Sequence, residues 1–198
     1  MDPLALGVFL VSATALLGSP GPGIAALVTI GRAEGFSRGL RYYAGLQVGL
    51  AAAAAISAAG LISVLLAFPA MMAALTLVAT VYLVYLAYSI ATAPVGSSLT
   101  GARTSSSPVA GLLLGLTNPK AFAAFATLFA SHRLLPADPQ ADLFFKWLLC
   151  VLVILVVDLA WLLVGVGLNK ASLPPAGERV LNLTLGALIV CAAILIYL

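Results

Sequence analysis

The sequence Ser19-Pro20-Gly21-Pro22-Gly23 interrupts an otherwise continuous apolar stretch near the start of the chain. Neither the residues before it (4–18) nor those after it (24–30) carry a charge. Proline inside a helix removes a backbone donor and costs about 3 kcal/mol or more. In a bilayer the freed carbonyls have no water to bind, so a break survives only where protein or a water-filled cavity satisfies it. The stretch therefore predicts a broken membrane helix beside a buried cavity.

The second half of this broken helix is expected to begin near Gly23. The first N–H groups of a helix have no partner within the helix, and this end favours negative charge. We therefore expect one side of a small-molecule site here, at membrane depth. The residues concerned are Ser19, Pro20, Gly21, Pro22 and Gly23.

The composition is that of an integral membrane protein. Of the 198 residues, 63% are hydrophobic and 8% are charged, with a mean hydropathy of +1.19, whereas a typical soluble domain is about 25% charged. The pI near 9.1 reflects basic residues in loops, so it predicts no nucleic-acid binding. Cys150 and Cys191 lie far apart in apolar runs, which argues against a disulfide framework or a metal-binding pair of thiols.

The apolar runs predict an all-α membrane protein of six spans, each of about 20 residues or more. The spans are expected at 4–31, 42–67, 70–92, 109–131, 143–168 and 180–198. Between them we expect short loops at 32–41, 132–142 and 169–178, a tight turn at Pro69, and a longer polar linker at 94–108. The linker separates one half of the chain (1–93) from the other (109–198).

Two of the expected spans are interrupted, the first at Pro-Gly-Pro (20–22) and the fourth at Asn118-Pro119-Lys120. Interrupted spans at corresponding positions of two halves indicate an inverted repeat with a binding site at the interface of the halves. Three spans per half is an odd number, so the second half must be upside down relative to the first. The sequence predicts a 3+3 inverted repeat within a single transmembrane transporter domain, 1–198.

The distribution of lysine and arginine predicts the orientation. The loops after spans one, three and five hold Arg32, Arg38, Arg41, Arg103, Lys170 and Arg179, and the opposite side holds Arg133 and Lys146. Because cytoplasmic loops carry the excess of positive charge, six against two places the odd-numbered loops in the cytoplasm. Both termini are then expected on the periplasmic or extracellular side.

Three polar side chains lie deep inside the expected spans. A charge at the bilayer centre costs at least about 2.5–3.5 kcal/mol, so Lys120 and Asp158 are candidate functional residues. The alternative is an ion pair between them that only fixes the packing of spans four and five. Asp158 is the candidate to bind and release a proton. Gln47 offers donors and acceptors for a ligand or, equally, for a helix–helix hydrogen bond.

Two pairs of glycines are spaced four residues apart, Gly45 with Gly49 and Gly111 with Gly115. This spacing places both members of a pair on one face of a helix. Such faces serve close helix packing more often than ligand contact, so we expect packing here.

Several motifs occur together along the chain. They are Ser-Pro-Gly-Pro at 19–22, a glycine-rich basic segment at 31–39, Ala-Gly-Leu-Gln-x-Gly-Leu at 44–50, Tyr82-Leu83, Leu-Thr-Asn-Pro-Lys at 116–120, Val-Val-Asp at 156–158, and Asn182 with Gly186. With these motifs the chain resembles the LysE/RhtB family of bacterial amino-acid exporters nearly end to end. Two positions depart from the family pattern: Ala79 stands where glycine is frequent, and His132 stands where proline is common. They leave the exact substrate open.

The resemblance implies a secondary active exporter of an amino acid or close derivative, driven by the proton gradient across the bacterial inner membrane. The implied partners are the amino acid, protons and the lipid bilayer, with no cofactor, no metal and no nucleic acid; assembly into a homo-oligomer is left open. We expect the substrate carboxylate at Gly21–Gly23 and Lys120. The ammonium, or a proton, is expected at Asp158 with carbonyls freed by the proline breaks. The expected substrate-binding residues are Ser19, Pro20, Gly21, Pro22, Gly23, Gln47, Asn118, Pro119 and Lys120, and Asp158 is expected to couple transport to protons.

Other functions fit the sequence less well. A metal transporter would need clusters of His, Cys or carboxylates, whereas this chain has one His and one acid deep in a span. A thiol-based electron carrier, or another ion translocator of related architecture, would place cysteines beside the broken helices, and Cys150 and Cys191 lie elsewhere. An enzyme would need a nucleophile–base pair or a metal motif, and a passive channel would not need a titratable buried Asp.

Overall fold

The computed structural model describes residues 3–60, 106–131, 133–170 and 174–194, together with scattered positions between 77 and 92. The helices in this part are α1 (Pro3–Gly18), α2 (Pro22–Ala58), α5 (Pro108–Thr117), α6 (Pro119–Ala130), α7 (Pro139–Lys170) and α8 (Pro175–Ile194). No strand occurs among the described residues, which agrees with the predicted all-α fold. Most of the expected third span and of the 94–108 linker lie outside the described residues, as do Pro69, Ala79, Arg103 and His132.

Every one of these helices begins at a proline. Proline is tolerated at the first helical position because its missing N–H would have no partner there. Side chains cap three of the helices: Ser107 accepts from Ala110 N at 3.1 Å, Asn118 from Ala121 N at 3.4 Å, and Asp138 from Ala141 N at 3.0 Å. The cap of α2 is Gly21, which has no side chain to offer.

Two pairs of consecutive helices are sharply bent where the sequence predicted breaks. α1 and α2 meet at 62° across residues 19–21, and α5 and α6 meet at 54° at Asn118. α7 is long and apolar enough over Pro139–Leu168 to cross a bilayer, with a hydropathy of 2.9. The described residues contain up to three such elements if each bent pair counts as one span. The count of six spans and the 3+3 repeat stay predictions.

The prediction of a loop at 32–41 is wrong. These residues are helical within α2 except for a kink at Gly35, where φ is 77° and ψ is −174°. Glycine adopts positive φ without the steric cost that a Cβ brings, so one residue joins the helical segments 22–34 and 36–58. The later loops are also shorter than expected, because α7 begins at Pro139 and extends to Lys170, and α8 begins at Pro175.

The glycine pairs bring α2 and α5 into direct backbone contact, which confirms the predicted packing. A Cβ on Gly45, Gly49, Gly111 or Gly115 would overlap a carbonyl oxygen of the other helix, at Pro108, Leu112, Tyr42 and Leu46 respectively. Because glycine has no side chain, the backbones of α2 and α5 can approach each other closely at these positions. The contact holds α5, and the break that follows it, against the segment of α2 that carries Gln47.

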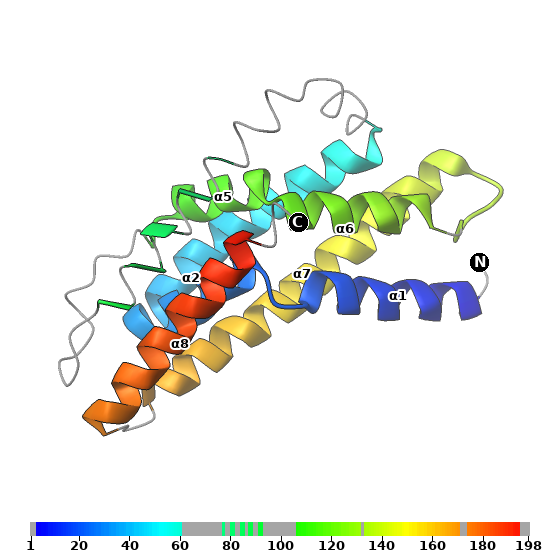
Figure 1. The fold of residues 1–198 in the computed structure, drawn as a ribbon. Coiled ribbons are helices and arrows are strands. Elements are labelled where there is room, and N and C mark those ends of the chain that lie inside the picture. Colours follow the sequence, from blue (N-terminus) through cyan, green and yellow to red (C-terminus); the bar gives the residue numbers. More distant parts are fainter. Residues whose placement is uncertain are drawn as a thin grey trace.

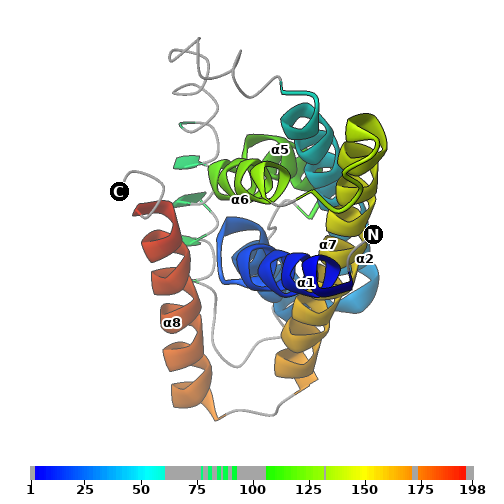
Figure 2. The same cartoon turned by 90° about the vertical axis from the view of Figure 1, so that its right-hand side faces the viewer.

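The remaining elements pack around this pair. α1 lies beside α6, and the long helix α7 runs across both (Figure 1). Seen along α1 and α6, α7 lies on one side and α8 on the other (Figure 2). α7 approaches the first segment of α2 closely, since a Cβ on Gly31 would lie 2.7 Å from the carbonyl oxygen of Leu162. This arrangement brings Asp158 of α7 next to both bent pairs.

Candidate functional site

A small cavity lies where the two breaks meet. Its polar lining consists of Asn118, Lys120 and Asp158, and the backbones of Gly21 and Gly23 also line it. The rest of its lining is apolar: Leu16, Leu17, Ile24, Leu50, Ala121, Ala124 and Ile154. The volume of about 30 Å³ has room for about two water molecules. An amino acid would therefore require the cavity to open.

The start of α2 forms one wall of this cavity. The first backbone bond in the helix is made by Ala25 N, which donates to the Gly21 carbonyl at 2.9 Å. The N–H groups of Gly23 and Ile24 precede it and have no hydrogen-bond partner among the described residues. Pro22 has no N–H to offer. This uncapped helix start faces the cavity with partial positive charge.

Lys120 lies against the same break from the side of α6. Its Nζ donates to the carbonyl oxygen of Ser19, and Trp161 Nε1 of α7 donates to the carbonyl oxygen of Gly18 at 3.2 Å. Both carbonyls at the end of α1 are therefore satisfied by side chains, as a break in a bilayer requires. We expected such carbonyls to be available to a ligand. In this conformation these two are occupied.

Gly21 is needed for the close approach of Lys120 rather than for its own backbone conformation. Its φ of −171° and ψ of −176° are extended values that any residue adopts. A Cβ at this position would lie 2.7 Å from Cδ and 3.1 Å from Nζ of Lys120. Glycine here leaves the space that the lysine side chain fills.

Asp158 lines the cavity from α7, and Gln47 of α2 is hydrogen-bonded to it. Gln47 Nε2 donates to Asp158 Oδ2 at 2.8 Å, and both residues are buried. The other amide atom, Gln47 Oε1, is buried and has no hydrogen-bond partner in the described part of the chain, so it is an available acceptor next to the carboxylate. Gln47 therefore makes the helix–helix hydrogen bond that we considered, and it keeps one group unused.

Lys120 and Asp158 do not pair with each other. Neither forms an ion pair with an N–O distance within 4.0 Å among the residues that the structure describes, yet both line the same cavity. The alternative of a buried Lys–Asp pair that only fixes packing is therefore not realised in this conformation. The cavity is thus lined by an unpaired cation and an unpaired anion, which a ligand carrying both charges could contact once the cavity opens.

The structure gathers only part of the expected site at the cavity. Gly21, Gly23, Asn118, Lys120 and Asp158 line it. Gln47 is connected to the cavity only by its hydrogen bond to Asp158, and the Ser19 carbonyl accepts a hydrogen bond from Lys120. Pro22 and Pro119 begin α2 and α6, and Pro20 is exposed.

The apolar lining was missed by the sequence analysis, although a signal for part of it existed. Ala124 follows Lys120 by four residues, and Ile154 precedes Asp158 by four. Residues four apart are neighbours on one helix face. The position of each charged residue therefore predicts that the apolar residue one helical turn away lines the same cavity.

Comparison with protein families finds a match that includes both helix breaks and all the polar residues of the cavity. The sequence model of the LysE type translocator family matches residues 14–198. The chain belongs to the LysE type translocator family. It is accordingly a transmembrane transporter. No curated protein and no solved structure gives a significant match.

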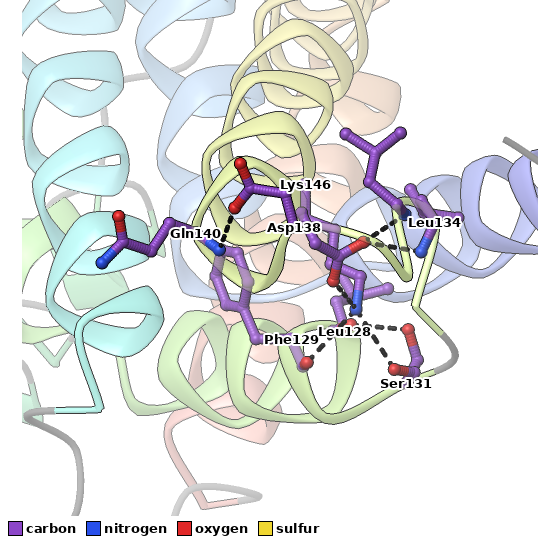
Figure 3. A network of polar contacts seen from close by, with 9 residues as sticks. Leu128, Phe129, Ser131, Leu134, Asp138, Gln140 and Lys146 are labelled. Atoms are coloured by element: carbon purple, nitrogen blue, oxygen red, sulfur yellow. Dashed lines mark hydrogen bonds and ion pairs between the residues drawn. The ribbon is translucent and has the colours of Figure 1, made fainter.

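This LysE type translocator holds a buried ion pair away from the cavity, where α6 ends and α7 begins (Figure 3). Lys146 Nζ lies 3.1 Å from Asp142 Oδ2, and the two side chains are 1% and 5% exposed. The ammonium also donates to the carbonyls of Ser131 at 3.1 Å and Phe129 at 3.4 Å. The carboxylate accepts from the backbone N of Leu134 at 2.6 Å and of Leu135 at 2.8 Å. The pair ties the end of α6 and its loop to α7.

Two residues that we counted as loop charges are thus buried. Lys146 belongs to this pair, and Arg32 is buried in α2, where its guanidinium donates to Asn182 Oδ1 of α8. Without them the lysine and arginine count changes from six against two to five against one. The odd-numbered loops still hold the excess of lysine and arginine, so the expected orientation is unchanged.

We expect Lys146→Met to lower the free energy of unfolding by about 3–5 kcal/mol, because it leaves the Asp142 charge buried without its partner. The matched control is Arg38→Met. Arg38, whose side chain is 61% exposed, lies 3.9 Å from Glu34, also spaced i, i+4, and an ion pair with so exposed a partner contributes about 0–1 kcal/mol. Denaturant unfolding of the purified protein in detergent measures both. Equal effects of the two substitutions would contradict the assigned role of the buried pair.

Proposed function

We propose that this translocator is a secondary active exporter of an amino acid or a close derivative, coupled to protons, in the bacterial inner membrane. The observation that carries the proposal is that Lys120 and Asp158 face one cavity without pairing. An amino acid is a zwitterion whose two charges are complementary to these residues. Its binding would satisfy both charges at once.

The carboxylate binds at the start of α2. There the free N–H groups of Gly23 and Ile24 meet the ammonium of Lys120, and hydrogen bonds to charged groups contribute about 1.5–3 kcal/mol each. To reach the ligand, Lys120 exchanges the Ser19 carbonyl for the substrate carboxylate. The substrate ammonium binds between Asp158 and the free Oε1 of Gln47.

Coupling follows from competition at Asp158. Its carboxylate can hold the substrate ammonium or a proton, but not both. A proton that enters from outside therefore displaces the amino acid, and an amino acid that enters from the cytoplasm displaces the proton. Alternation between the two exports one species as the other enters.

Alternating access requires the cavity to open to each side in turn. We propose that α1 with α2 up to Gly35, and α5 with α6, are each a single interrupted span of a 3+3 inverted repeat, with halves 1–93 and 109–198 and the linker 94–108. The supporting observation is that the second helix of each bent pair begins at the cavity, at Gly21–Gly23 and Asn118–Lys120. Movement of one half against the other would then widen the site.

Exchange across proteoliposomes tests the proposal. Vesicles containing the protein are loaded with a labelled amino acid and diluted into buffer with or without the same unlabelled amino acid. The exporter should release label faster when unlabelled amino acid is present outside, and protein-free vesicles should not. No exchange with any of the twenty amino acids would contradict the proposed function.

The proposed topology predicts that reporter fusions at Gly101 and after Leu198 report opposite sides of the membrane. Gly101 lies in the linker after the third span, and the chain ends after the sixth. The excess of Lys and Arg in the odd-numbered loops places Gly101 in the cytoplasm. Paired phosphatase and fluorescent-protein fusions measure this. Two fusions on the same side would exclude both the six spans and the inverted repeat.

A further inference from the structure

Among the described residues, one cation, Lys120, and one anion, Asp158, line the cavity. The other buried charged residues among the described positions, Arg32, Asp142 and Lys146, are bound to partners outside the cavity. The segment 61–100, most of which the structure does not describe, contains no Asp, Glu, Lys, Arg or His. The α-carboxylate and α-ammonium of an amino acid would therefore pair with Lys120 and Asp158 and leave no charge of the cavity for the side chain.

The part of the cavity left for the substrate side chain is apolar. Leu50 and Ile154 line it from α2 and α7, and Ala124 lines it from α6. Ile154 and Ala124 are 2% and 6% exposed, so both are parts of the packed interior rather than of the surface. A charged side chain would meet no partner here, and a buried charge without a partner is strongly disfavoured. An apolar side chain would gain from leaving water.

On the basis of the proposed function, we infer that the substrate is an amino acid with a neutral, apolar side chain, which is held against Leu50, Ala124 and Ile154. The two charges of the cavity recognise the amino-acid backbone, and these side chains recognise the remainder. Basic and acidic amino acids are excluded because their third charge stays unpaired.

Competition in the exchange assay tests this substrate class. Unlabelled leucine, valine, methionine, lysine, arginine, aspartate and glutamate compete in turn for release of labelled leucine. Leucine, valine or methionine should compete at concentrations at least about 100-fold lower than the charged amino acids, the factor expected for a buried charge that loses its partner. Labelled lysine and labelled glutamate are tested directly in parallel.

The outcomes separate the two claims. Exchange of lysine or glutamate at least as effective as that of leucine would overturn the substrate class and leave the exporter intact. No exchange of any amino acid would overturn the proposed function and this inference with it. Preference for apolar amino acids supports both.

A substitution locates the side-chain pocket. Ala124→Asp adds an anion one turn from Lys120, and it should improve competition by lysine relative to leucine about tenfold or more. Ala124→Asn introduces a side chain of nearly the same size as aspartate but without the charge. It is therefore the matched control, and it should not improve competition by lysine. If Ala124→Asp does not fold, Ala124→Leu should weaken leucine relative to glycine by about 10- to 100-fold, the usual range for a few methylene groups in an apolar pocket. An unchanged ratio in the folded variants would place the side chain elsewhere and overturn the inference.

Discussion

Asp158→Asn should abolish the accumulation of substrate against its gradient and leave some exchange at equal pH on both sides. Asparagine keeps the shape of the side chain and can still accept the hydrogen bond from Gln47 Nε2, but it cannot bind and release a proton. For one proton per amino acid, a gradient of one pH unit supports about a tenfold concentration ratio. The variant should reach a ratio of about one.

Proteoliposomes with an imposed pH gradient measure this ratio from the label inside and outside. Asp142→Asn is the matched control, because Asp142 is the other buried acid of α7 and lies outside the cavity. It should unfold more easily but still couple. If Asp158→Asn continues to concentrate the amino acid, Asp158 has a structural role and the coupling argument is wrong.

Lys120→Met should remove most of the preference for an amino acid over its amide. The amide lacks the negative charge, so the difference in affinity reports the interaction with the carboxylate. Loss of one charge-assisted hydrogen bond of about 1.5–3 kcal/mol reduces the affinity for the acid roughly 10- to 150-fold. The amide should lose little. Calorimetry in detergent measures both ligands on the wild-type protein and on the variant.

Gly21→Ala provides a second variant that keeps the lysine charge. Its Cβ would lie 2.7 Å from Lys120 Cδ, so the lysine side chain must move, and the site loses the space of one methyl group. We expect a smaller loss of affinity than in Lys120→Met, and a larger loss for bulky substrates than for small ones. An unchanged acid-to-amide ratio in Lys120→Met would mean that the start of α2 holds the carboxylate alone.

The positions of the helix breaks could be predicted from the sequence because proline and glycine act locally. Proline has no N–H and fixes its own φ, so Pro22 and Pro119 mark helix starts whatever surrounds them. The contact of α2 with α5 was predictable for a similar reason. A glycine on a helix face, as at Gly45 or Gly111, leaves room for another backbone.

The loops could not be placed as well, because charge alone does not show that a segment leaves the helix. Arg32 is buried with a partner 150 residues away in the sequence, a contact that only the packing of α2 against α8 creates. The buried ion pair of Lys146 was closer to being predictable from the sequence. Asp142 precedes it by four residues, a spacing that forms ion pairs on helices, but the expected start of the span at 143 separated the two.

The cavity needs the whole fold, since its lining comes from several helices that cross near one point. The charged residues Lys120 and Asp158 identify themselves because a bilayer disfavours them. Nothing in the sequence distinguishes Leu50 or Leu16 from the many other leucines. Their role depends on which face of each helix the neighbouring helices cover.

The central claim is that a proton and an amino acid compete for the cavity and therefore move in opposite directions. Vesicles containing the protein and a pH-sensitive dye are loaded with the amino acid and diluted into buffer without it, with the membrane potential clamped by potassium and valinomycin. We predict that the lumen becomes more acidic as the amino acid leaves, and that Asp158→Asn shows no such change. Amino-acid release from wild-type vesicles with no change in internal pH would contradict it.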